Sequence, residues 1–195
     1  MKPSVEPGGT REAILRRAVD LASVEGLEGL TIGRLATELE MSKSGLFRHF
    51  GSKQELQLAT VERATALFRH EVLEPAAGAT PGLERLRALI ESYLSYLERE
   101  VLPGGCFLSA AGAEFDGRPG PVRDAIAASS RDWGRELERQ AELTRDHGEL
   151  PADVDPAQLV FELGAYATRA NAAYQLYGDR RAFDRARAAI AKSIG

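Results

Sequence analysis

This chain has little of the chemistry that cross-links a protein or anchors it in a membrane. It contains a single cysteine, Cys106, so no disulfide can form within the chain. A chain without disulfides is typical of the reducing cytoplasm, and we expect a cytoplasmic location. No apolar run approaches the roughly 18–20 residues that a membrane-spanning helix needs, so no membrane partner is expected. Met1–Gly9 is rich in Pro and Gly, lacks an apolar run, and is predicted to be a disordered lead-in.

The residues of a catalytic or metal site are also scarce. The three histidines, His49, His70 and His147, are scattered, and no spacing of His, Cys and carboxylate suggests a metal site. No serine motif resembles a nucleophile elbow, and the glycine pairs do not form a phosphate-cradling pattern. We therefore expect no catalytic residues, no metal and no cofactor, although an enzyme is the first competing class.

Charge is unevenly distributed along the chain. The net charge is −4, residues 1–56 are neutral, and residues 57–195 carry the whole excess of acid. Within Ser42–Lys53 there are three cations, Lys43, Arg48 and Lys53, and no acidic residue. An acidic protein argues against a general nucleic-acid coat, and a local basic cluster favours docking at a defined site. By composition alone, the cluster would be an ordinary solvated face.

The pattern of apolar residues, glycines and prolines predicts an all-α protein of about nine helices. No segment shows the sustained alternation of a strand. We expect an N-terminal domain at 10–56 and a larger second domain at 57–195. The expected helices, several of which end at Gly or Pro, cover residues 10–25, 31–39, 42–50, 52–74, 81–102, 106–115, 120–147, 155–177 and 180–194.

Residues 31–56 carry the most specific signal. Thr31 and Ser42 can each cap a helix N-terminus with the hydroxyl, and apolar residues recur behind each cap at helical spacing. Ser52 begins a third helix, with Glu55 at the capping-box position. Two short helices joined by a tight turn form a helix-turn-helix, whose second helix enters the major groove of DNA. This spacing favours DNA binding over an incidental charged face.

The same residues carry a family resemblance. The chain resembles TetR-type transcriptional repressors most strongly over Thr10–Glu62. The matching strings are Leu30-Thr31-Ile32, Ser42-Lys43-Ser44-Gly45-Leu46-Phe47-Arg48-His49-Phe50 and Ser52-Lys53-Gln54-Glu55-Leu56. The later chain is a looser match, with Gly104-Gly105-Cys106-Phe107 and the ending Tyr174–Asp179.

The resemblance implies a set of contacts with a double-stranded DNA operator. Phe47 stands where tyrosine is usual, so the usual bond from a hydroxyl to a phosphate cannot form. Its role is then either packing or apolar contact with a thymine methyl. Gly45 lets the duplex approach but offers no side chain, and Arg48 could read guanine or pair with phosphate. The implied DNA-binding residues are Thr31, Ser42, Lys43, Ser44, Gly45, Phe47, Arg48, His49 and Lys53.

The resemblance also implies a homodimer and a ligand. Residues 10–56 would then be the helix-turn-helix DNA-binding domain, and residues 57–195 the effector-binding and dimerisation domain. The last two helices carry a surface of small residues, and in this family they form a four-helix interface between subunits. The alternative is that these faces are buried within one subunit. The middle helices would bind a small, largely apolar effector that releases the repressor from a palindromic operator. The candidate lining residues are Tyr93, Leu97, Phe107, Glu114, Phe115, Trp133, Leu137, Phe161, Tyr166, Arg169 and Asn171. Two further alternatives are a helical protein–protein interaction module and a ligand-binding protein that does not bind DNA.

Overall fold

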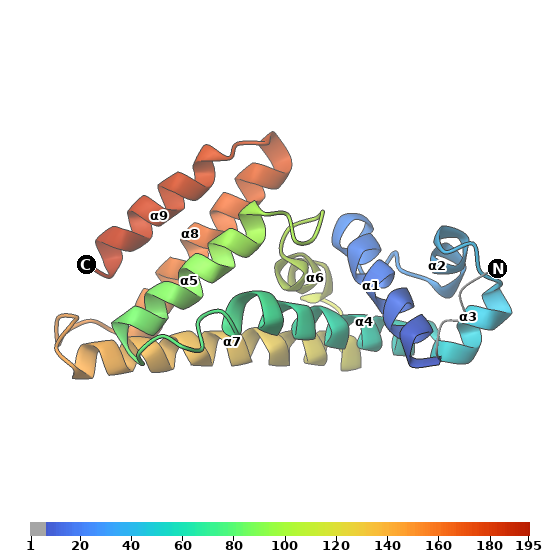
Figure 1. The fold of residues 1–195 in the computed structure, drawn as a ribbon, viewed down its shortest axis with the longest axis horizontal. Coiled ribbons are helices and arrows are strands. Elements are labelled where there is room, and N and C mark those ends of the chain that lie inside the picture. Colours follow the sequence, from blue (N-terminus) through green and yellow to red (C-terminus); the bar gives the residue numbers. More distant parts are fainter. Residues whose placement is uncertain (1–6) are drawn as a thin grey trace. The chain divides into compact units, whose positions relative to one another are not determined.

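The computed structural model describes residues 7–195, and every regular element in that range is helical, as predicted (Figure 1). No helix in this range is long and apolar enough to cross a membrane. The elements are α1 (Pro7–Glu25), α2 (Ile32–Glu38), α3 (Lys43–Phe50), α4 (Lys53–Phe68), a π-helical turn (Arg69–Leu73), α5 (Leu83–Glu98), α6 (Phe107–Phe115), α7 (Pro121–Asp146), α8 (Pro156–Tyr177) and α9 (Arg181–Ser193).

The start of α1 corrects one expectation. The sequence predicts a first helix that begins at residue 10, whereas the helix begins at Pro7 and Thr10 lies within it. Proline is well suited to a first helical turn because its φ is already helical and its missing N–H has no partner there. The first six residues of the predicted lead-in lie outside the described residues.

The first of two compact units contains residues up to 66 together with 102–128. Helices α1, α2, α3 and α6 therefore belong to one unit, along with most of α4 and the start of α7. Its core is apolar and fully covered, and it includes Ile14, Ala18, Leu35, Leu46 and Leu56. The predicted domain boundary at residue 56 remains a prediction.

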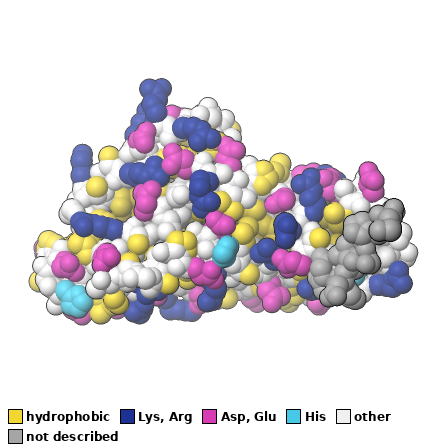
Figure 2. All heavy atoms as spheres, in the orientation of Figure 1, with side chains coloured by type: hydrophobic (Ala, Val, Ile, Leu, Met, Phe, Trp, Pro, Cys, Tyr) yellow, Lys and Arg dark blue, Asp and Glu magenta, His cyan; other side chains and the backbone are white. Residues whose placement is uncertain are grey.

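The second unit contains residues 67–101 and 129–195. Here α5, α8 and α9 lie side by side (Figure 1). Acidic and basic side chains are interspersed over the surface of these helices (Figure 2). Arg187 of α9 contributes to this pattern, because it pairs with both Glu91 and Glu98 of α5 at 2.9 and 2.8 Å. These pairs tie α9 to α5 at the solvent edge of an apolar core.

Candidate nucleic-acid interface

Helices α2 and α3 both begin at the predicted hydroxyl caps. The Thr31 Oγ1 atom accepts a hydrogen bond from the Arg34 N–H at 3.0 Å, and Ser42 Oγ accepts one from the Gly45 N–H at 3.1 Å. Each cap satisfies one of the N–H groups that a helix leaves without a partner at its start. The third predicted cap also forms, since Ser52 Oγ accepts from the Glu55 N–H. The helix-turn-helix therefore begins and ends where the sequence places it.

Helix α3 has one buried and one exposed face. Leu46 and Phe50 are buried in the first unit. An eight-residue helix is not stable alone in water, so this packing holds it in place. The opposite face is open to solvent and carries Lys43, Ser44, Phe47 and Arg48. Neither Lys43 nor Arg48 has an ion-pair partner among residues 7–195, which leaves both charges available to an anion.

The exposed face of α3 forms one side of a shallow concavity of about 870 Å³. Its other side is the first turn of α2, which the sequence had not assigned to the site. The signal for this side is local: Ile32 and Gly33 directly follow the Thr31 cap, and the turn between the helices brings them opposite α3. The lining residues are Ile32, Gly33, Lys43, Ser44, Phe47 and Arg48.

Gly45 has a structural reason in addition to the one predicted. A Cβ at this position would lie 2.9 Å from Ser42 Oγ, the atom that caps α3. Any larger residue would displace the cap. The absence of a side chain thus preserves the start of α3 as well as clearing space in front of it.

Lys53 and His49 lie outside the concavity. The Lys53 Nζ atom donates to Glu28 Oε1 at 2.7 Å, so its charge is already partnered within the chain. This bond from Lys53 lowers the pKa of the Glu28 carboxyl. The His49 ring is half-buried beside Phe50, with 6.2 Å between ring centroids. Their implied contacts with DNA remain predictions.

An ionic network joins α1 to α2 behind the interface. Arg34 bonds Glu25 and Glu38, and Arg17 of α1 also bonds Glu38. The bond from Arg34 lowers the pKa of the Glu25 carboxyl, and the bonds from Arg17 and then Arg34 lower the pKa of Glu38. The Arg34 guanidinium is therefore occupied by these bonds, which hold α1 and α2 together.

The carboxylate of Glu114, a predicted effector contact, binds the turn between α1 and α2. Its two oxygens accept hydrogen bonds from the backbone N–H groups of Leu27 and Glu28 at 2.7 and 3.1 Å. Gly26 allows this approach, because a Cβ there would lie 2.8 Å from Glu114 Oε1. The same turn is held from α4 by Gln57, which donates to the Leu27 carbonyl at 2.9 Å.

The other predicted effector contacts are distributed over both units. Phe107 and Phe115 are buried in the first unit with α6. In the second unit, Tyr93 and Trp133 lie together with ring centroids 5.7 Å apart, and Phe68 packs edge-on against both. Two more of the predicted effector contacts, Leu97 and Leu137, are buried in the second unit.

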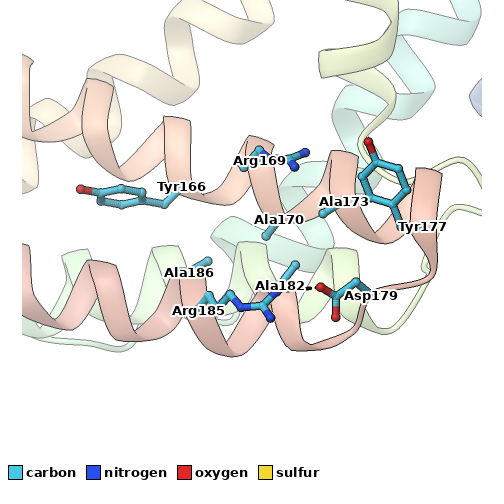
Figure 3. A pocket seen from close by; sticks show the side chains of 9 residues that line it. All are labelled: Tyr166, Arg169, Ala170, Ala173, Tyr177, Asp179, Ala182, Arg185 and Ala186. Atoms are coloured by element: carbon cyan, nitrogen blue, oxygen red, sulfur yellow. Dashed lines mark hydrogen bonds and ion pairs between the residues drawn. The ribbon is translucent and has the colours of Figure 1, made fainter.

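Four predicted effector contacts lie on α8. Phe161 is 71% exposed, and Tyr166 and Arg169 line a groove between α8 and α9 (Figure 3). Asn171 is half-buried, and its Oδ1 atom is fully covered with no hydrogen-bond partner among residues 7–195. The effector-binding role of all eleven residues remains a prediction.

Within residues 7–195, no group of three or more His, Cys, Asp and Glu side chains could hold a metal ion. The site is thus built from a capped helix, a local pair of cations and an exposed aromatic ring. This combination defines a helix-turn-helix protein whose second helix presents its open face to solvent.

Comparison with known proteins identifies the family. The family model described as "Bacterial regulatory proteins, tetR family" matches residues 14–60, and "Tetracyclin repressor-like, C-terminal domain" matches residues 82–190. Because the second match alone covers more than half of the chain, the chain belongs to the tetR family, whose members are DNA-binding transcriptional regulators.

Individual relatives agree with this assignment. The chain is 29% identical over 128 residues to the HTH-type transcriptional regulator TcmR of Streptomyces glaucescens, a match that covers 65% of the chain and 56% of TcmR. A TetR transcriptional regulator of Chloroflexus aurantiacus J-10-FL superposes with a TM-score of 0.86 at 25% identity, covering 95% of this chain and 93% of that one. AibR, solved with isovaleryl coenzyme A and operator DNA, shares the fold with a TM-score of 0.74 at 22% identity, covering 94% of this chain and 97% of that one.

Proposed function

We propose that this chain is a cytoplasmic transcriptional repressor that binds a double-stranded DNA operator through α3. The observation that carries the proposal is the exposed face of α3, on which Lys43 and Arg48 flank Ser44 and Phe47 around one concavity. Two unpaired cations beside the capped start of a helix attract phosphates. The chain's net negative charge elsewhere disfavours unspecific adhesion to DNA.

A gel-shift assay on the DNA upstream of the protein's own gene tests this proposal. Lys43→Ala should weaken binding equally for all sequences, because it removes a phosphate contact. Arg48→Ala should weaken binding and also relax base preference. Arg131→Ala removes an exposed cation on α7 and serves as the matched control. If neither Lys43→Ala nor Arg48→Ala changes affinity while the protein binds the duplex, α3 is not the reading helix.

The proposed repressor acts as a homodimer through α8 and α9. Among residues 7–195, five large apolar side chains are strongly exposed, and three of them, Phe161, Leu176 and Tyr177, are on α8. Phe161, Ala165, Ala172 and Leu176 follow helical spacing along one exposed stripe. Beside it, the alanines of α8 and α9 face one another across the groove in Figure 3. Small residues allow the helices of a second copy to approach closely, and a two-fold dimer suits a palindromic operator.

Part of the expected small-residue surface is used within one subunit. Ala167, Ala170 and Ala173 are buried in the second unit, and so are Ile190 of α9 and Ile194 directly after it. The proposed dimer surface therefore consists of the exposed stripe on α8 and the rim of the groove. The buried residues of the predicted surface pack beneath this proposed dimer surface.

The second part of the proposed function is release by a small, largely apolar effector bound within residues 57–195. AibR, which shares this fold, was solved with a coenzyme A thioester as well as operator DNA. In this chain the buried Oδ1 atom of Asn171 supports a polar contact, because an unpaired buried amide oxygen is unfavourable until it accepts a hydrogen bond. A ligand that prefers a conformation other than the DNA-binding one would lower the affinity for the operator. By linkage, the operator would lower the affinity for the ligand by the same factor.

Competition experiments test the effector. Compounds that displace the protein from its operator should bind Asn171→Ala more weakly while that variant retains its affinity for DNA. Gln158→Ala, an exposed amide at the start of α8, is the matched control. A compound that releases both variants equally would not use Asn171.

A further inference from the structure

Phe47 does not pack into the protein. Its side chain is 54% exposed, whereas its neighbours Leu46 and Phe50 supply the buried face of α3. The sequence left two roles for this residue, packing or apolar contact with DNA, and the exposure removes the first. A single exposed apolar side chain is common on protein surfaces, so exposure alone is weak evidence for a contact with DNA. The surroundings of Phe47 are more informative.

The concavity beside Phe47 has an apolar wall and a cationic rim. Ile32 lies across it on α2, and Gly33 leaves the α2 backbone bare beside it. The Lys43 side chain runs over this backbone, since a Cβ on Gly33 would lie 3.4 Å from Lys43 Cε. Lys43 and Arg48 place positive charge on the rim, which suits a polyanion and disfavours an apolar peptide.

A DNA duplex offers such a site one apolar group. In the major groove the edges of adenine, guanine and cytosine present donors and acceptors, and thymine adds a 5-methyl group. A phenyl ring cannot replace the water that these polar edges would lose, so covering them is unfavourable. Covering a methyl is favourable.

We propose that Phe47, with Ile32 opposite, reads the 5-methyl group of one thymine in each half of the operator. The proposal rests on the DNA-binding function proposed above, and it assigns base specificity to a residue that has no hydrogen-bonding group. Lys43 and Arg48 bring the duplex onto this face, and the phenyl ring then discriminates between bases.

Uracil interference tests the proposal with the full-length wild-type protein. The probe is a duplex recovered from a random-sequence library by repeated selection with the protein. Thymines are then replaced one at a time by deoxyuridine, which removes the methyl and keeps every hydrogen-bonding group. We expect one replacement in each half-site to weaken binding about fourfold, the effect of losing one buried methyl.

The variant Phe47→Ala links the effect to this residue. It should bind the thymine and deoxyuridine duplexes with equal affinity at that position, while sensitivity elsewhere is unchanged. Val24→Ala removes an exposed apolar side chain outside α3 and should retain the wild-type ratio. Tight binding with no sensitive thymine, or the same sensitivity in Phe47→Ala, overturns the proposal and leaves DNA binding intact. Failure to recover any duplex from the library instead overturns the DNA-binding function itself.

Discussion

The Oε2 atom of Glu114 accepts a 2.7 Å hydrogen bond from the backbone N–H of Leu27, which lies 87 residues earlier in the chain. Its other oxygen accepts from the N–H of Glu28. One side chain of α6 thus satisfies two backbone donors of the turn that joins α1 to α2. The orientation of α2 within the first unit depends on this turn, so the Glu114 bonds act on the proposed DNA-binding face through one short helix.

Removal of the Glu114 carboxylate should destabilise the protein. Glu114→Ala leaves two partly buried N–H groups without acceptors, and we expect a loss of about 1–3 kcal/mol in the free energy of unfolding. Denaturant titration measures the change. Asp116→Asn, which removes an exposed negative charge directly after α6, should have little effect. Equal stability of the two variants would show that water replaces the carboxylate.

Gly104 should not tolerate a side chain. A Cβ at this position would lie 1.7 Å from the carbonyl oxygen of Ser23, and backbone atoms cannot move aside cheaply. Gly104→Ala should cost about 3 kcal/mol, the upper end of the range for overpacking. Gly112→Ala is the matched control: a Cβ there meets nothing within 4 Å, and the change should stabilise α6 by roughly 1 kcal/mol. Thermal denaturation of both variants should show shifts of opposite sign.

Glu40 closes α2 with a left-handed backbone, at a φ of 52°. This conformation costs a residue with a side chain roughly 1–2 kcal/mol and costs glycine almost nothing. Glu40→Gly should therefore stabilise the fold by about 1 kcal/mol. The same substitution at Glu62, an exposed residue within α4, should destabilise it by a similar amount. A loss of stability in both variants would mean that the Glu40 side chain contributes more than its backbone costs.

Acid should weaken the junction of α1 and α2. The bonds from Arg34 and Arg17 lower the pKa values of Glu25 and Glu38 below the ordinary 4.5. A carboxyl with a lowered folded-state pKa stabilises the fold above its unfolded pKa. That stability is lost as the pH falls through the folded value. Asp20 acts in the opposite direction, because burial raises its pKa.

Melting temperatures between pH 7 and pH 3 measure this effect. The wild type should lose stability below about pH 4.5. Arg34→Met should be less stable at neutral pH and should lose less on acidification, because Glu25 loses the bond that lowers its pKa while Glu38 keeps its bond from Arg17. Parallel curves for the two proteins would rule out the network as the source.

Leu176→Glu should separate the proposed dimer. Leu176 is 71% exposed, so the substitution leaves the core of the subunit intact and places a charge on the proposed interface. At micromolar concentration, light scattering should give twice the 21.1 kDa chain mass for the wild type and a single chain for the variant. Val24→Glu, an equal change on α1, should remain dimeric. A wild-type monomer with intact operator binding contradicts the dimer.

Local signals made most of the fold predictable. The hydroxyls of Thr31, Ser42 and Ser52 each accept a hydrogen bond from the backbone N–H three residues later. These caps are local, so the sequence alone was enough to predict them. The bond from Leu27 to Glu114 spans 87 residues, and the periodicity of apolar residues along the sequence does not predict such a contact. Exposure of Phe47 could not be predicted either, since Leu46, Phe47 and Phe50 are all apolar and only packing shows which of them faces solvent.

The ion pair between Lys53 and Glu28 has a consequence for how salt affects operator binding. A lysine that neutralises a phosphate releases a counterion from the duplex, and binding weakens as salt rises. To make its predicted phosphate contact, Lys53 must first leave Glu28, and the freed carboxylate beside Arg118 then attracts a cation of its own. The two ion movements oppose each other. The salt dependence of binding will therefore indicate fewer phosphate contacts than a structure of the complex would contain.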